Sequence, residues 1–147
     1  AEINIVLKRL SADGVLSEQQ AKSVNMFAIK RFLQSGLYER MSAAANDANE
    51  LIKRELEFTL LLDVNKNNGV VQGIIDCCFT ENNEWVIVDY KTTSTRDKDP
   101  RDVANSYRMQ LQIYADALQK LSGLPVKETW VYLLSAGEAF RVSREQA

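Results

Sequence analysis

The stretch that decides the fold is residues 72–92, QGIIDCCFTENNEWVIVDYKT. It holds two runs rich in β-branched and aromatic residues, which favour strands, on either side of the polar pair Asn82-Asn83. Asparagine tolerates the positive φ angles of a two-residue hairpin turn, so the stretch is predicted to be a β-hairpin. Counting outward from that turn brings Asp76 opposite Asp89.

In this register the Cβ atoms of Asp76 and Asp89 would lie roughly 4.5–5.5 Å apart on one face of the hairpin. Lys91, two residues beyond Asp89, is predicted to project from the same face. Opposed carboxylates in a hydrophobic strand pair repel each other and lose hydration, and a divalent cation removes both costs. Magnesium takes oxygen ligands and keeps several waters, so two carboxylates and a carbonyl suffice. In the plainer alternative the two aspartates mark strand ends and the lysine neutralises them.

The rest of the sequence predicts an α/β fold with a mixed sheet of about five strands flanked by helices. Residues 1–50 are expected to be a helical N-terminal part and residues 51–147 the sheet core of the same single domain. Helices are expected over residues 3–10, 18–35, 37–45 and 104–121, and strands over 54–62, 70–80, 85–92, 129–134 and 139–142. Residues 95–103 are polar and contain Pro100, so they are predicted to form a loop.

Composition excludes several classes of site. The 147 residues include no histidine, which removes Ser-His-Asp and Cys-His catalysis and histidine zinc sites. The two cysteines, Cys77 and Cys78, are adjacent and too few for an iron–sulfur cluster. They are expected to be buried free thiols on opposite strand faces, in a reducing, cytoplasmic compartment. No apolar run approaches a membrane span, and the net charge of −2 restricts any nucleic-acid binding to a local patch.

The segments Gly73-Ile74-Ile75-Asp76 and Val88-Asp89-Tyr90-Lys91-Thr92 together resemble the core motif of PD-(D/E)XK nucleases. More closely, they resemble the C-terminal nuclease domain of bacterial AddA- and RecB-type ATP-dependent helicase–nucleases. Three further segments extend the resemblance: the upstream acidic strand at residues 54–58, the downstream Q-x-x-x-Y helix at 110–114 and the closing hairpin at 130–138. The resemblance covers nearly the whole chain and implies a restriction-endonuclease-like core.

The resemblance also implies roles for individual residues. The implied metal ligands are Asp76, Asp89 and the carbonyl of Tyr90, and the implied catalytic set is Asp76, Asp89, Lys91, Glu55, Gln110 and Tyr114. Glu57 is an alternative to Glu55 as the upstream acid. Gln110 and Tyr114 would organise the site or touch the DNA backbone, although Tyr114 also fits a purely structural place in the core.

By resemblance, the function is that of a Mg²⁺-dependent exonuclease, with Mn²⁺ as a possible substitute and no iron–sulfur cluster. The implied substrate is DNA, whose single-stranded ends a helicase in the same parent chain would feed to the site during double-strand break repair and recombination. A second nuclease/helicase subunit is the other implied partner, and no membrane is expected. Two alternatives remain open: a stand-alone or phage-type exonuclease of this fold, and a degenerate module that binds DNA or partners without cleaving.

One departure from the family pattern concerns histidine. Members of this type carry a G-x-x-x-H motif upstream, whose histidine contributes to metal binding. The sequence has no histidine, and the helical pattern at its start lacks an N-cap. The chain is therefore expected to be a fragment that begins downstream of this motif, with loss of the motif as the alternative.

Overall fold

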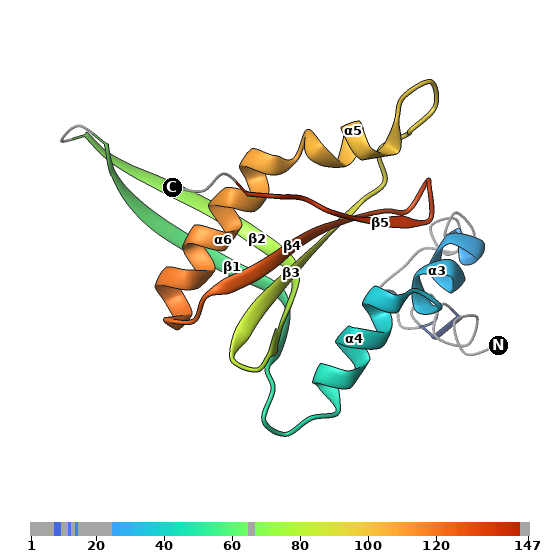
Figure 1. Ribbon diagram of the computed structural model, residues 1–147, viewed down its shortest axis with the longest axis horizontal. Coiled ribbons are helices and arrows are strands. Elements are labelled where there is room, and N and C mark those ends of the chain that lie inside the picture. Colours follow the sequence, from blue (N-terminus) through green and yellow to red (C-terminus); the bar gives the residue numbers. More distant parts are fainter. Residues whose placement is uncertain (1–7, 10–11, 13, 15–24, 65–66, 145–147) are drawn as a thin grey trace.

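The computed structural model describes residues 8, 9, 12, 14, 25–64 and 67–144, with the side chains of 62–67 left aside. Its centre is a five-stranded sheet whose strands lie in chain order (Figure 1). The strands are β1 (Ile52–Val64), β2 (Asn67–Glu81), β3 (Glu84–Lys91), β4 (Val126–Leu133) and β5 (Glu138–Arg141). All neighbours are antiparallel except β3 and β4, which are parallel, so the predicted mixed sheet is confirmed.

Four described helices flank this sheet: α3 (Met26–Leu33), α4 (Gly36–Ala45), α5 (Pro100–Asn105) and α6 (Arg108–Ser122). Asn25 caps α3 and Ser35 caps α4, each by accepting a hydrogen bond from a backbone N–H of the first turn. Gly123 ends α6 in the left-handed conformation, at φ 73°. The helix predicted over 3–10 and the first part of the one predicted over 18–35 lie outside the continuously described residues. None of the described helices is long and apolar enough to cross a membrane.

The prediction of a loop over residues 95–103 is wrong in its last part. Helix α5 begins at Pro100, and the side chain of Asp99 accepts a hydrogen bond from the N–H of Arg101. Proline suits this position because the first N–H groups of a helix have no partner within it. The single helix predicted over 104–121 is accordingly two helices, separated at Ser106 and Tyr107.

The two faces of the sheet bury separate hydrophobic clusters. One contains side chains from α5 and α6, including Val103, Leu111 and Leu118, and we call it the α6 layer. The other contains Leu37 and Met41 of α4, and we call it the α4 layer. Each layer covers one face because the strands alternate their side chains between the two.

The adjacent cysteines follow this alternation. Cys77 lies in the α4 layer and Cys78 in the α6 layer, and both are free and buried. Burial raises the pKa of the Cys77 thiol to about 11 and that of Cys78 to about 12. The prediction of buried thiols on opposite faces is confirmed.

The hairpin that connects β2 to β3 has the predicted turn. Asn82 and Asn83 take positive φ angles of 53° and 65°, as a two-residue turn requires. The ladder runs outward from Glu81, opposite Glu84, to Cys77, opposite Val88. This register is the predicted one, and its next step outward leads to Asp76 and Asp89.

Candidate active site

The regular alternation of β1 and β2 breaks at Glu55 and Asp76. In β2, Ile75 packs in the α6 layer and Cys77 in the α4 layer, although residues two apart in an unbroken strand share a face. The β1–β2 ladder pairs residues on both sides of Glu55 and Asp76 but skips this pair, and Glu55 takes a φ of 51°. In each strand, therefore, residues two apart across this position point to opposite faces of the sheet instead of the same one.

Asp76 uses its carboxylate to bind the neighbouring strand. Its Oδ2 accepts a hydrogen bond of 2.9 Å from the backbone N–H of Tyr90 in β3. The same carboxylate is close enough to Asp89 to raise the pKa of that residue. The structure therefore brings the two predicted carboxylates together at the end of the hairpin ladder.

Asp89 is the buried member of the pair, with only 2% of its surface exposed. Its Oδ2 lies 3.0 Å from Nζ of Lys91, which places the lysine beside it as predicted. Burial raises the pKa of Asp89 to about 6, since it disfavours the charged form, and Asp76 adds to the rise while Lys91 opposes it. At neutral pH the Asp89 carboxylate is ionised, although burial makes its charge unfavourable. A cation in addition to Lys91 would offset that cost.

Glu55 and Glu57 lie further from this centre. Glu55 stands at the level of Asp76, but its side chain is exposed. Glu57 pairs with Ile74, two positions further along, and its side chain does not join the two aspartates. Within the described residues, no three His, Cys, Asp or Glu side chains come close enough to hold a metal ion. The structure thus assembles two acids of the predicted set and leaves the upstream acid outside.

Gln110 and Tyr114 lie one turn apart on α6, and the phenol of Tyr114 is near the two carboxylates. Nε2 of Gln110 donates a hydrogen bond of 3.0 Å to the hydroxyl of Tyr114. Burial raises the pKa of Tyr114, and so do the charges of Asp89 and Asp76, whereas Lys91 lowers it. The phenol therefore lies within the electrostatic field of the site.

The Tyr114 ring is also packed as a core side chain. It meets the ring of Phe58 edge to face, with centroids 5.6 Å apart. A Cβ atom at Gly73, opposite Phe58 in the ladder, would lie 2.7 Å from the Phe58 ring and 3.3 Å from Tyr114. Gly73, the glycine of the G-x-x-D segment, thus leaves the room that these two rings occupy. Tyr114 is therefore both a packed core residue and a neighbour of the carboxylates.

The fit of a divalent cation can be judged from the acceptor atoms that lack donors. Oδ2 of Asp89 is buried and has the ammonium of Lys91 3.0 Å away, and Oε1 of Gln110 is buried without a hydrogen-bond donor among the described residues. A buried acceptor without a donor is costly, and hard cations such as Mg²⁺ bind carboxylate and carbonyl oxygens. The carboxylates of Asp76 and Asp89 fit such an ion, whose remaining ligands would have to include water.

Tyr107 is a site residue that the sequence interpretation missed. Helical periodicity assigns it to the apolar stripe of the helix, whereas the structure places Nζ of Lys91 4.6 Å from the centre of its ring. Its hydroxyl is 2.5 Å from Oγ1 of Thr93. Its spacing of three residues from Gln110 was the available signal, because residues three apart share a helix face.

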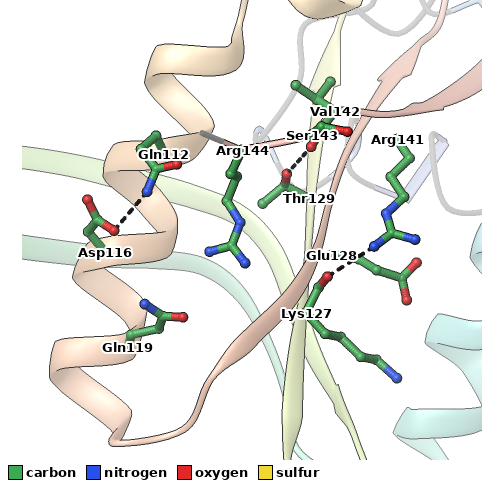
Figure 2. A pocket seen from close by; sticks show the side chains of 10 residues that line it. All are labelled: Gln112, Asp116, Gln119, Lys127, Glu128, Thr129, Arg141, Val142, Ser143 and Arg144. Carbon is green, nitrogen blue, oxygen red and sulfur yellow. Dashed lines mark hydrogen bonds between the residues drawn. The ribbon is translucent and has the colours of Figure 1, made fainter. Parts of the chain in front are cut away.

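A separate hollow of about 440 Å³ lies between α6, β4 and the residues after β5 (Figure 2). Its lining contains the cations Lys127, Arg141 and Arg144 and the acids Asp116 and Glu128, so its charge is mixed. None of the predicted site residues lines it. The carboxylate pair with its lysine is therefore the better candidate for the active site.

The chain is similar in sequence to known nucleases. A sequence profile of the PD-(D/E)XK nuclease superfamily matches residues 5–146. An ATP-dependent helicase/nuclease subunit from Thermoanaerobacter sp. (strain X514) is 34% identical over 134 residues, 84% of this chain and 10% of that protein. The protein of that name from Clostridium perfringens (strain ATCC 13124) is 31% identical over 152 residues, 95% of this chain and 12% of its own length.

The chain therefore spans about a tenth of the length of these relatives. Among solved structures, one described as "Crystal structure of SSO0001" superposes with a TM-score of 0.52 at 15% identity. The superposition covers 96% of this chain and 63% of the other. At this identity the likeness shows a shared fold.

Proposed function

The chain belongs to the PD-(D/E)XK nuclease superfamily, and we propose that it is the metal-dependent DNA exonuclease module of a helicase–nuclease. The observation that carries the proposal is the buried Asp89, which lies beside Lys91 and close to Asp76 on one face of the sheet. Similarity to the helicase/nuclease proteins of Thermoanaerobacter and Clostridium supports a parent protein that processes DNA ends in double-strand break repair. In that setting a motor would deliver single-stranded DNA to the site.

In the proposed reaction Asp76 and Asp89 would hold Mg²⁺, or Mn²⁺ in its place, and the Tyr90 carbonyl is the proposed further ligand. When bound, the ion supplies a water of lowered pKa and offsets charge on the phosphate. Asp76 is oriented for this role because the N–H of Tyr90 fixes one of its oxygens. Asp89 is kept from bulk water, which strengthens its interaction with any cation.

Lys91 has a distinct part in the proposal. Its ammonium lies at the carboxylate of Asp89 with 22% of the lysine side chain exposed, so it can meet a phosphate that enters from solvent. There it would stabilise negative charge that develops on the phosphate, or orient the attacking water. Gln110 and Tyr114 would border the site from α6 and orient the DNA backbone or the bound water.

The experiment is a cleavage assay on single-stranded DNA labelled at one end, with Mg²⁺ or Mn²⁺ and with EDTA as the metal-free control. We expect Lys91→Met to abolish cleavage. Lys127→Met is the matched control, because Nζ of Lys127 also lies 3.0 Å from a carboxylate, that of Glu81. Cleavage by Lys91→Met at the rate of Lys127→Met would contradict the proposal.

A second candidate function is a module that binds DNA without cleaving it. The separation of Glu55 from the two aspartates favours it, together with the absence of histidine from the sequence. This candidate predicts binding of single-stranded DNA that is unaffected by EDTA, and no cleavage with either metal.

A further inference from the structure

Lys91 is held from two sides. Its Nζ lies 3.0 Å from Oδ2 of Asp89 and 4.6 Å from the centre of the Tyr107 ring. The first contact is an ion pair, and the second is attraction between a cation and the face of an aromatic ring. The ammonium is thus placed between a charged partner and a neutral one.

The ring of Tyr107 is itself fixed. The residue lies at the joint between α5 and α6, with φ −93° and ψ 8°, and its side chain does not cap the helix. Its hydroxyl is 2.5 Å from Oγ1 of Thr93, just beyond the end of β3. The carbonyl of Thr93 in turn accepts a hydrogen bond of 2.7 Å from the hydroxyl of Ser135. The ring is therefore tied to the same strand end that carries the lysine.

The two partners of Lys91 differ in what happens when a divalent cation binds. A cation on Asp89 would compete with the ammonium for the same oxygen and would repel it. The ring of Tyr107 carries no charge and attracts the ammonium without using the carboxylate. The site therefore contains a place for the lysine that is compatible with a loaded Asp89.

We propose that Tyr107 is a positioning residue that holds the ammonium of Lys91 beside the site while Asp89 binds the divalent cation. The inference rests on the proposed function, because it assumes that Asp89 is a metal ligand. It assigns no chemical step to the tyrosine, whose ring acts only through Lys91.

The test is a double-mutant cycle of Tyr107→Leu and Lys91→Met, read by calorimetric titration with Mn²⁺ and by cleavage of single-stranded DNA. Among the described residues, loss of the ring leaves the ammonium with Asp89 as its ion-pair partner, so we expect Tyr107→Leu to weaken Mn²⁺ binding about 3- to 10-fold. We expect kcat/KM to fall about 5- to 30-fold. In the Lys91→Met background, Tyr107→Leu should leave Mn²⁺ affinity unchanged.

Conservative variants separate this role from packing. Tyr107→Phe keeps the ring and is expected to stay within about 3-fold of the wild type in both measurements. Phe27→Leu is the control, because it removes another cation–ring contact, that with Arg31 at 5.8 Å, and should change neither. If Tyr107→Leu does not fold, as judged by circular dichroism, Tyr107→Met replaces it in the cycle, because methionine also lacks an aromatic face, and we expect the same weakening of Mn²⁺ binding.

Equal weakening of Mn²⁺ binding by Tyr107→Leu with and without Lys91 would overturn the inference, as would Tyr107→Phe behaving like Tyr107→Leu. Absence of cleavage by the wild-type protein would overturn the proposed function but not the inference, provided that Mn²⁺ binds and the cycle shows coupling. Absence of Mn²⁺ binding would overturn both.

Discussion

Each face of the sheet carries a lysine–carboxylate ion pair of the same length, but the pKa of the carboxyl group is shifted in opposite directions on the two faces. On the α4 face, Nζ of Lys127 lies 3.0 Å from Glu81, and on the α6 face Nζ of Lys91 lies 3.0 Å from Asp89. The hydrogen bonds of Arg40 are the main reason that the pKa of Glu81 falls to about 2, whereas burial raises that of Asp89 to about 6. The distance within the ion pair therefore does not determine the direction of the pKa shift. The number of donors around the carboxylate and its burial do.

Arg40 accounts for most of this difference. Its guanidinium donates to both oxygens of Glu81, at 2.6 and 3.1 Å, and to both of Glu128, at 2.7 and 3.1 Å. This network joins α4 to the ends of β2 and β4 and leaves those carboxylates fully supplied with donors. The α6 face has no such arginine at Asp89 among the described residues, where the ammonium of Lys91 is the cation beside Oδ2.

The largest expected effect comes from neutralising Asp89. Asp89→Asn should reduce cleavage by at least about 100-fold, since a metal ligand loses its charge. In metal-free buffer at pH 8 it should raise the free energy of unfolding by about 1–2 kcal/mol, because it removes an unfavourable buried charge. Cleavage assays and urea denaturation provide the two measurements.

Glu81→Gln is the matched variant on the other face, where we expect unchanged cleavage and lower stability. If Asp89→Asn were instead to destabilise the metal-free protein as Glu81→Gln does, the contrast between the two faces would be false.

Arg40→Met should produce the next largest change, and only in stability. It leaves Glu81 and Glu128 partly buried without their main donor, which we expect to cost about 1–3 kcal/mol. The cleavage rate at a temperature where the protein is folded should stay within about 2-fold of the wild type. A large loss of activity in a fully folded Arg40→Met protein would show that the two faces are coupled.

Gly73→Ala tests the packing of the α6 face. The new Cβ would lie 2.7 Å from the ring of Phe58, so this ring and that of Tyr114 must move. We expect a loss of about 1–3 kcal/mol in the free energy of unfolding, together with reduced cleavage. Gly36→Ala is the control at the start of α4, where a Cβ meets nothing within 4 Å. Equal stability of the two variants would contradict the close fit at Gly73.

The smallest expected effect is a difference in pH dependence. The stabilising contribution of Glu81 is complete above the ordinary pKa of 4.5 and is lost as the pH falls towards about 2. Asp89 acts in the opposite direction: its contribution is complete below the ordinary pKa of 3.8 and is lost as the pH rises through about 6.

Thermal unfolding of each single variant against the wild type, across pH 2–8 without divalent cations, should show these opposite slopes, each about 1–2 kcal/mol over its window. Addition of Mg²⁺ should reverse the slope due to Asp89 by stabilising the charged form. Slopes of the same sign for both acids would contradict the assigned pKa shifts.

The hairpin was predictable from sequence because its determinants are local. The Asn82-Asn83 turn sets the register as far as Cys77 and Val88, and one further step along both strands leads to Asp76 and Asp89. Lys91 is then expected on the same face as Asp89, because residues two apart in a strand share a face.

The features that escaped prediction depend on contacts between distant segments or on a break in a periodic pattern. Arg40 is 88 residues from Glu128, and nothing in their local sequence indicates the pairing. The change of face at Glu55 and Asp76 interrupts the alternation from which strand faces are inferred. The position of Tyr107 depends on the end of α5 immediately before it, which the helical periodicity does not mark.

The two adjacent thiols give the protein a pair of built-in reporters. Cys77 is covered by the α4 layer and Cys78 by the α6 layer, and neither thiol is ionised to a useful extent near neutral pH. An alkylating reagent can therefore reach each sulfur only when the layer above it opens. The labelling rate of Cys78 in a Cys77→Ala protein would measure the opening of the α6 layer. The labelling rate of Cys77 in a Cys78→Ala protein would measure the opening of the α4 layer.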